Sequence, residues 1–329
     1  DNAQITASTN LLDTLREKYH LMKYISMFHS VMLCSRGDWM SKFLTVAAPT
    51  LKNSRDHIKI PALNATLAIS LPANTKDIFY ATIEKELVFD QIMRYHNASL
   101  FNPSGKGANK TALYATATSW EFVNIHAKME WPMSLVFNSG VQQKYQLLFR
   151  TILMWRRLEK NFAKLWKKCH GIREIEKMRH SMQLFITAYI GFISTFVVAP
   201  QWSKLIANMA IVKDMDQLFK IHEESLDASI KGFFLMDQNL LRKITKIGCI
   251  CILFIDETKK WEKSTESDLI DLQEKLQMAQ PLFKHYEAFE KAVVSLINEL
   301  MAIANREAND IYSDFVNWIN INNNYYQTP

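Results

Sequence analysis

Apolar residues recur at steps of three and four along most of this 329-residue chain, and this spacing is the strongest constraint on its fold. Such spacing places residues on one face of an α-helix. The clearest stripe lies near the C-terminus and comprises Leu282, Tyr286, Phe289, Val293, Leu296, Leu300 and Ile303, continued by Ile311, Phe315 and Trp318. Glycine and proline, which interrupt helices, number only 8 each. The pattern predicts an all-α fold, an elongated multi-helix bundle.

The C-terminal stripe is regular enough for a coiled coil, but aromatic rings are bulky for a two-stranded seam, so we favour packing within a bundle. A charged, weakly patterned stretch at 256–271 is expected to be a loop. Further helices are predicted over residues 11–32, 39–48, 61–71, 75–96, 139–166, 174–199, 200–211, 215–234 and 239–255.

One segment has the two-residue period of a strand. Val123, Ile125 and Ala127 alternate with polar residues, and Met133 to Phe137 could form the partner strand of a small β-hairpin. The chain is therefore expected to divide into a first helical part (1–118), a β-hairpin (119–138) and a second helical bundle (139–329).

Residues 182–200 include no Asp, Glu, Lys or Arg, and their number is close to that of a membrane span. A membrane-associated helical protein that uses this segment is therefore an alternative reading. Polar residues within it, such as Gln183, Ser194 and Thr195, instead favour a helix buried in a large bundle, without a membrane span.

Catalytic patterns are weak. Residues 104–111 resemble a phosphate loop, but Ser104 and Asn109 stand where glycines are needed. His222 lacks the second histidine of a zinc protease, and the apolar setting of Cys249 and Cys251 predicts buried, reduced thiols. We expect a protein that is not an enzyme, with no catalytic residue, cofactor or metal.

Residues 144–173 include nine Lys or Arg against one acid, Glu159. This helix could present a solvated face, or it could attract an acidic protein, a lipid headgroup or nucleic acid. Aromatic residues here lie on the apolar stripe rather than among the charges, which argues against nucleic acid.

Several stretches, in order along nearly the whole chain, resemble the C-terminal half of the gamma-tubulin complex components, a family that includes yeast spindle pole body components. Residues 35–39 (S-R-G-D-W) are similar to its Q-G-D-F, and residues 131–137 (W-P-M-S-L-V-F) to its W-P-L-S-L-V-I. Residues 144–150 resemble the family's motif K-Y-Q-L-L-F-R and have the same seven residues. Two later stretches, 196–202 and 214–227, resemble F-E-V-x-E-P-x-W and D-x-D-x-L…H-x-x-F-L-D. The second-component branch fits best.

The sequence departs from the family where Val197 and Ala199 replace two glutamates, a change that also produces the membrane-like run. The resemblance implies a scaffold that binds gamma-tubulin, pairs with a paralogous component and enters a ring that templates microtubule nucleation. It implies a cytoplasmic, cytoskeletal location at a microtubule organising centre (spindle pole body or centrosome). It also implies that this sequence corresponds to the gamma-tubulin-binding half, without the family's N-terminal half.

Six residues are predicted to contact gamma-tubulin. Arg36, Gly37 and Asp38 lie at a junction between two predicted helices, where they could instead only cap and brace the junction. Lys144, Tyr145 and Arg150 lie in the stretch most similar to the family, and the two cations would suit an acidic partner.

Overall fold

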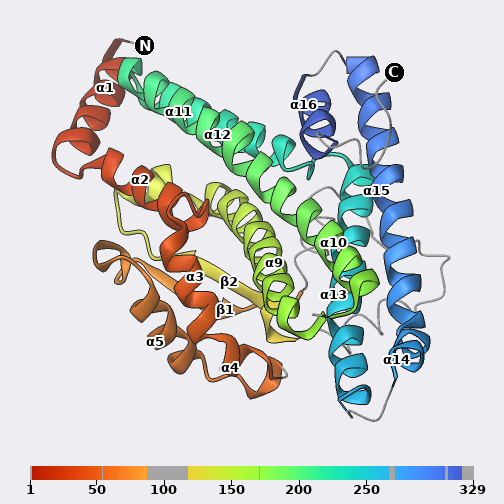
Figure 1. Ribbon diagram of the computed structural model, residues 1–329. Coiled ribbons are helices and arrows are strands. Elements are labelled where there is room, and N and C mark those ends of the chain that lie inside the picture. Colours follow the sequence, from red (N-terminus) through yellow and green to blue (C-terminus); the bar gives the residue numbers. More distant parts are fainter. Residues whose placement is uncertain are drawn as a thin grey trace. The chain divides into compact units, whose positions relative to one another are not determined.

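The computed structural model describes residues 2–53, 55–86, 118–169, 171–266, 271–307 and 310–320 (Figure 1). The chain forms two compact units. Unit 1 comprises Asp1–Met154 and Ser194–Met236, and unit 2 comprises Trp155–Ile193 and Asp237–Pro329. These units do not follow the expected division at 118 and 138, because long helices carry the chain from one unit into the other. Helices dominate the described residues, which confirms the all-α prediction.

Unit 1 contains a helical N-terminal region, a small sheet and a later helical pair. Its elements are α1 (Asn2–Glu17), α2 (Leu21–Met32), α3 (Gly37–Val46), α4 (Ala48–Leu51), η1 (Arg55–His57), α5 (Ile60–Ser70), η2 (Ala73–Thr75), β1 (Phe79–Ile83), η3 (Ser119–Phe122), β2 (Val123–Ala127), α8 (Met133–Val136), the first part of α9 (Ser139–Cys169), η4 (Ile193–Val198), α11 (Ala199–Ile211) and α12 (Met215–Gly232). Helices α11 and α12 lie side by side (Figure 1).

The small sheet pairs strands that are distant in sequence. β1 runs antiparallel to β2, with Phe79 opposite Ala127 and Ile83 opposite Val123. The predicted hairpin partner, Met133 to Phe137, is wrong, since Met133–Val136 forms a helical turn that buries Met133 and Val136. The helix predicted over 75–96 is also wrong through residue 83, because Phe79 and Ala81 alternate with exposed Tyr80. Residues 87–96 lie outside the described part, as does the segment 104–111.

The core of unit 1 centres on Phe28 of α2. Its ring stacks on Phe137 with centroids 4.1 Å apart, and it also meets Tyr145 at 4.9 Å and Phe79 at 5.2 Å. Aromatic side chains from three other segments therefore converge on Phe28. This convergence fixes α2 and α9 against the sheet.

Unit 2 is a bundle formed by the remainder of α9, α10 (Arg173–Phe192), α13 (Gln238–Ser264), α14 (Leu272–Met278), α15 (Gln280–Glu307) and α16 (Asp310–Ile319). Helices α13 and α15 lie side by side (Figure 1). Aromatic pairs join its helices: Trp155 with Tyr189, Phe185 with Phe289, and Phe162 with Phe254. The C-terminal stripe supplies part of this core, since Phe289, Leu296 and Leu300 are fully buried.

The loop expected at 256–271 is wrong over its first part, where α13 continues to Ser264. Thr258 and Trp261 are buried on the inner face of this turn, and Trp261 Nε1 donates to the carbonyl of Lys275 at 3.0 Å. The buried residues thus stabilise this part of α13 as a helix, although most of its other residues are charged. Residues 267–270 lie outside the described part.

The membrane-like run belongs to a continuous helical stretch, Arg173–Ile211, with a π-helical turn at Ile193–Val198. Within the described residues this is the one helix long and apolar enough to cross a membrane, and half of its most apolar window is buried. Phe185, Ile186 and Tyr189 are buried inside the protein. A helix in the core of a folded unit can be equally long and apolar, so length and composition alone are weak evidence for a membrane span.

Candidate functional site

Two of the stretches singled out in the sequence meet inside unit 1. Lys144 Nζ of α9 forms an ion pair with Asp227 Oδ1 of α12 at 2.7 Å. One residue further along α9, the Tyr145 hydroxyl lies 3.0 Å from His222 Nε2, also on α12. Asp214 begins α12 by accepting the backbone N–H of Gln217. The stretches 144–150 and 214–227 therefore form one interlocked helix pair.

Burial sets the protonation states in this pair. It raises the pKa of the Tyr145 phenol well above its ordinary range, so the hydroxyl keeps its proton. Burial, with a smaller contribution from the Lys144 charge, lowers the pKa of His222 to about 4, so the imidazole is neutral. Tyr145 therefore donates and His222 Nε2 accepts. His222 Nδ1 is buried without a hydrogen-bond partner in the described part of the chain.

The same turns of α9 also bind the sheet. Gln146 Nε2 lies 3.0 Å from His126 Nδ1, and His126 Nε2 lies 2.9 Å from Glu84 Oε1. The hydrogen bond from His126 is the main reason that the pKa of Glu84 falls to about 2, although partial burial opposes the shift. This chain of contacts connects α9 through β2 to the residue that follows β1.

Arg150 is enclosed rather than exposed. It is buried, and its Nη2 donates to the carbonyls of Glu86 and Glu121 at 2.7 and 2.9 Å. Tyr145 is buried as well, and Lys144 is ion-paired with its side chain 13% exposed. Both charges are therefore used within the fold, and the predicted contact of Lys144 and Arg150 with gamma-tubulin stays a prediction.

Arg36, Gly37 and Asp38 have the opposite character. All three are exposed at the start of α3. Beneath them, Trp39 is buried and its Nε1 donates to the carbonyl of Ser30 at 3.1 Å, which braces the junction. A methyl group placed on Gly37 would meet no atom within 4 Å. Within the described part of the chain, this surface is exposed and rests on buried Trp39.

Sequence reasoning missed two exposed tryptophans. Trp166 of the basic helix, whose aromatic residues were predicted to lie on the apolar stripe, is 53% exposed. Trp131, in the W-P-M-S-L-V-F stretch, is 71% exposed, and Leu135, one helical turn later, is also exposed. Met133, Val136 and Phe137 of the same stretch are buried. Exposed tryptophans often anchor protein interfaces. The stretch was recognisable, but which of its apolar residues face solvent depends on the tertiary packing of α8.

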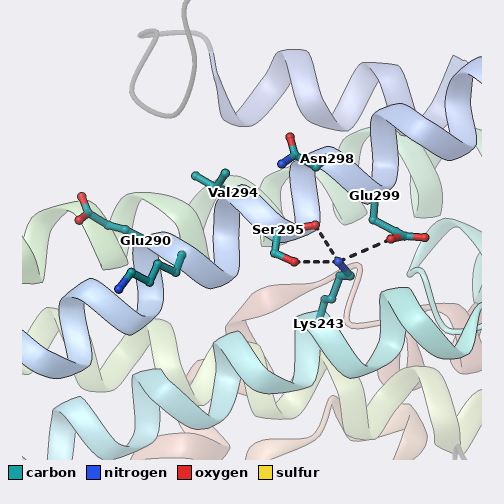
Figure 2. Close-up of a pocket in the computed structure, with 7 residues that line it drawn as sticks. Lys243, Glu290, Val294, Ser295, Asn298 and Glu299 are labelled. Carbon is teal, nitrogen blue, oxygen red and sulfur yellow. Dashed lines mark hydrogen bonds and ion pairs between the residues drawn. The ribbon is translucent and has the colours of Figure 1, made fainter.

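Unit 2 has an open hollow of about 520 Å³ that is lined by residues of α15 and by Lys243 of α13 (Figure 2). Lys243 Nζ binds the Ser295 carbonyl, the Ser295 hydroxyl and Glu299. The cation thus holds the two helices together, and Val294 and Asn298 complete the lining. Lys243 is committed to these internal contacts.

The described residues offer little for catalysis. Among them, no group of three or more His, Cys, Asp or Glu side chains could hold a metal ion. Cys251 is buried as expected, whereas Cys249 is only partly buried. On the basic helix, Arg156 pairs with Glu159 at 3.1 Å, and Lys164 and Lys167 are exposed.

Comparison with known proteins agrees with the motifs. The profile of the family described as "Gamma tubulin complex component C-terminal" matches residues 21–326. Gamma-tubulin complex component 2 of Arabidopsis thaliana is 22% identical over 80% of this chain and 40% of its own length. The same component of Mus musculus is 24% identical over 80% of this chain and 31% of its own length.

Spindle pole body component alp4 of Schizosaccharomyces pombe is 21% identical over 93% of this chain and 47% of its own length. The chain thus spans less than half the length of these relatives. These comparisons confirm the resemblance that was inferred from the motifs. The relatives include second components, the branch that the motifs fitted best. Because the family profile covers most of the sequence, this chain belongs to the gamma-tubulin complex component family.

Proposed function

We propose that this chain is a non-catalytic scaffold subunit of a gamma-tubulin complex, in which it binds gamma-tubulin. The observation that carries the proposal is the family match over residues 21–326. Its relatives are named as gamma-tubulin complex components and a spindle pole body component. A cytoplasmic location at a microtubule organising centre, either a spindle pole body or a centrosome, follows from the same relationship.

The proposed mechanism is templating. A scaffold that holds one gamma-tubulin, beside a paralogous component that holds another, raises the effective concentration of the subunits. Further copies in a ring would extend the array at the spacing that microtubule nucleation needs. Such a role requires rigid elements and an exposed contact surface rather than a reaction centre.

We place the gamma-tubulin contact at Arg36, Gly37 and Asp38. These residues are exposed, the space beside Gly37 is open, and buried Trp39 supports them. Lys144, Tyr145 and Arg150 act indirectly, because their contacts hold α9 against α12 and the sheet. They are positioning residues for unit 1.

The experiment is a binding titration of purified gamma-tubulin against this chain and two variants. Gly37→Trp places a bulky ring on the proposed surface, at a position where a Cβ would meet no described atom within 4 Å. Asn305→Trp places the same ring on an exposed position of α15 in unit 2 and serves as the matched control. We expect Gly37→Trp to weaken binding at least tenfold, about 1.4 kcal/mol, with an unchanged melting temperature, and Asn305→Trp to bind normally.

The outcomes separate function from location. If the unmodified chain does not bind gamma-tubulin, the proposed function fails. If it binds and Gly37→Trp binds equally well, the function stands and the assignment of the surface to residues 36–38 fails.

A further inference from the structure

Residues 33–38, the α2–α3 junction, contain the surface at which we place the gamma-tubulin contact. Local features at the end of this junction do little to fix its conformation. Arg36 precedes α3 with an extended backbone, and its side chain makes no cap hydrogen bond with the helix. A side-chain carbon at Gly37 would meet no described atom within 4 Å. The conformation of the junction therefore depends on the residues around these two.

Trp39, one residue after the junction, ties the two helices together. Its indole is buried, and Nε1 donates to the carbonyl of Ser30 at 3.1 Å. Ser30 lies in the last turn of α2, where carbonyl groups have no partner within the helix. One hydrogen bond thus joins the first turn of α3 to the last turn of α2 and closes the junction into a loop.

The core of unit 1 holds the Trp39 ring in place. The ring lies nearly parallel to that of Phe149 on α9, with an interplanar angle of 15° and a centroid distance of 6.3 Å. The ring of Phe43, on α3, is also 6.3 Å away. Phe149 is fully buried and belongs to the K-Y-Q-L-L-F-R stretch. A buried stretch of α9 therefore supports the exposed junction through one indole ring.

The hydrogen bond from Trp39 distinguishes this chain from the motif of its family. The family's Q-G-D-F has phenylalanine where this chain has Trp39. A phenylalanine ring could fill the same part of the core, but it has no N–H group to donate to Ser30. The bond to the Ser30 carbonyl is therefore a feature of this chain that the family's motif does not supply.

Cys34 sets the direction of the chain at the start of the junction. Its φ of 52° lies in the left-handed region, which glycine usually occupies at the end of a helix. The side chain is buried, and its thiol donates weakly to the carbonyl of Val31 at an Sγ–O distance of 3.5 Å. Cys34 and Trp39 thus each satisfy one carbonyl in the last turn of α2.

We propose that Trp39 and Cys34 are positioning residues: the indole N–H of one and the left-handed backbone of the other hold the α2–α3 junction in the conformation that meets gamma-tubulin. This inference rests on the proposed function and on the placement of the contact at residues 36–38. A junction that is already ordered loses less conformational entropy on binding than a mobile one. Both residues therefore favour the complex from beneath the contact surface.

The first test is Trp39→Phe, which keeps an aromatic ring in the core and removes the N–H group. Amide hydrogen exchange of the full chain, read by mass spectrometry, should become faster at residues 33–38 than in the unmodified chain. Calorimetric titration with purified gamma-tubulin should show an affinity at least about fivefold lower. The loss should appear as a less favourable binding entropy, because the partner must now order the junction.

Trp155→Phe is the matched control. Trp155 belongs to unit 2 and is fully buried, and its Nε1 has no hydrogen-bond partner in the described part of the chain. The same atoms are thus removed from a core without the loss of a hydrogen bond. This variant should leave exchange at residues 33–38 and gamma-tubulin affinity unchanged, whatever its effect on the melting temperature.

Position 34 gives a second, independent pair of variants. Cys34→Val places a β-branched residue in the left-handed region, which such residues strongly disfavour. It should disturb the junction and weaken gamma-tubulin binding at least about fivefold. Cys34→Gly adopts the same backbone conformation without strain, so it should bind as the unmodified chain does. This pair tests the positioning of the junction even if Trp39→Phe fails to fold.

The outcomes separate this inference from the proposed function. Unchanged exchange at residues 33–38 in Trp39→Phe and Cys34→Val would overturn the positioning role, whether or not gamma-tubulin binds. Faster exchange with unchanged affinity would also overturn it, and the proposed function would stand. An equal loss of affinity in Trp155→Phe would show that general destabilisation is the cause, against the inference. Failure of the unmodified chain to bind gamma-tubulin would refute the proposed function and this inference together.

Discussion

Tyr145 and His222 lie 77 residues apart in the sequence and share a buried hydrogen bond of 3.0 Å. Beside it, Lys144 and Asp227 form an ion pair. In both contacts, one polar side chain comes from α9 and the other comes from α12. The stretches by which the chain resembles its family are, at these positions, contacts that join one helix to another.

We predict that Tyr145→Phe destabilises unit 1 by about 1–3 kcal/mol, because it leaves His222 Nε2 buried without its donor. Urea unfolding followed by circular dichroism measures the loss. A double-mutant cycle with His222→Leu should show that the second substitution costs less once the first is present. Additive costs would mean that the two side chains do not interact.

Acid should destabilise unit 1 at mild pH. Burial lowers the pKa of His29 and of His222 to about 4, whereas both titrate near their ordinary value when unfolded. The unfolded chain therefore binds more protons below about pH 6.5. The stability is fully present above that pH and falls as the pH drops towards about 4.

Unfolding midpoints at pH values between about 7 and 5 test this dependence. His29 stacks on Trp202 with centroids 3.9 Å apart, so His29→Phe keeps a ring at this position. This variant should flatten the slope of stability against pH. An unchanged slope would show that His29 does not contribute to it.

Gly232→Ala should destabilise the protein by about 1–3 kcal/mol, although alanine normally favours a helix. The new methyl carbon would lie 2.5 Å from Val197 Cγ1. Gly37→Ala is the matched control, since it meets no atom within 4 Å and should leave the melting temperature nearly unchanged. Combining Gly232→Ala with Val197→Ala should recover part of the loss. Without that recovery, the clash is not the cause.

Arg150→Ala should cost several times more stability than Arg156→Ala. Arg150 is buried and donates to two backbone carbonyls, so its loss removes two hydrogen bonds made by a buried charged group. Arg156 forms a partly exposed pair with Glu159, a type of contact worth about 0–1 kcal/mol. Thermal unfolding of the two variants compares them directly. Equal shifts would contradict the structural role assigned to Arg150.

Spacing and motifs determined the fold class, the long helices and the family. Steps of three and four suffice to predict the helices and the fold class, because a helix is formed by hydrogen bonds within one segment and buries the face on which its apolar residues recur. The stripe from Leu282 to Ile303 therefore identified a core helix without knowledge of its neighbours. The strand over Val123–Ala127 was recognisable by the same local reasoning.

Only the tertiary structure decided which strand pairs with Val123–Ala127, and whether a cation in a motif is exposed. Strand pairing joins separate segments, so alternation in one strand cannot identify Phe79–Ile83 as its partner. Arg150 looks like a surface residue by type, but the carbonyls that satisfy it belong to Glu86 and Glu121, far from it in the sequence. Gly37 remained open for the converse reason, because no distant segment folds over the start of α3 among the described residues.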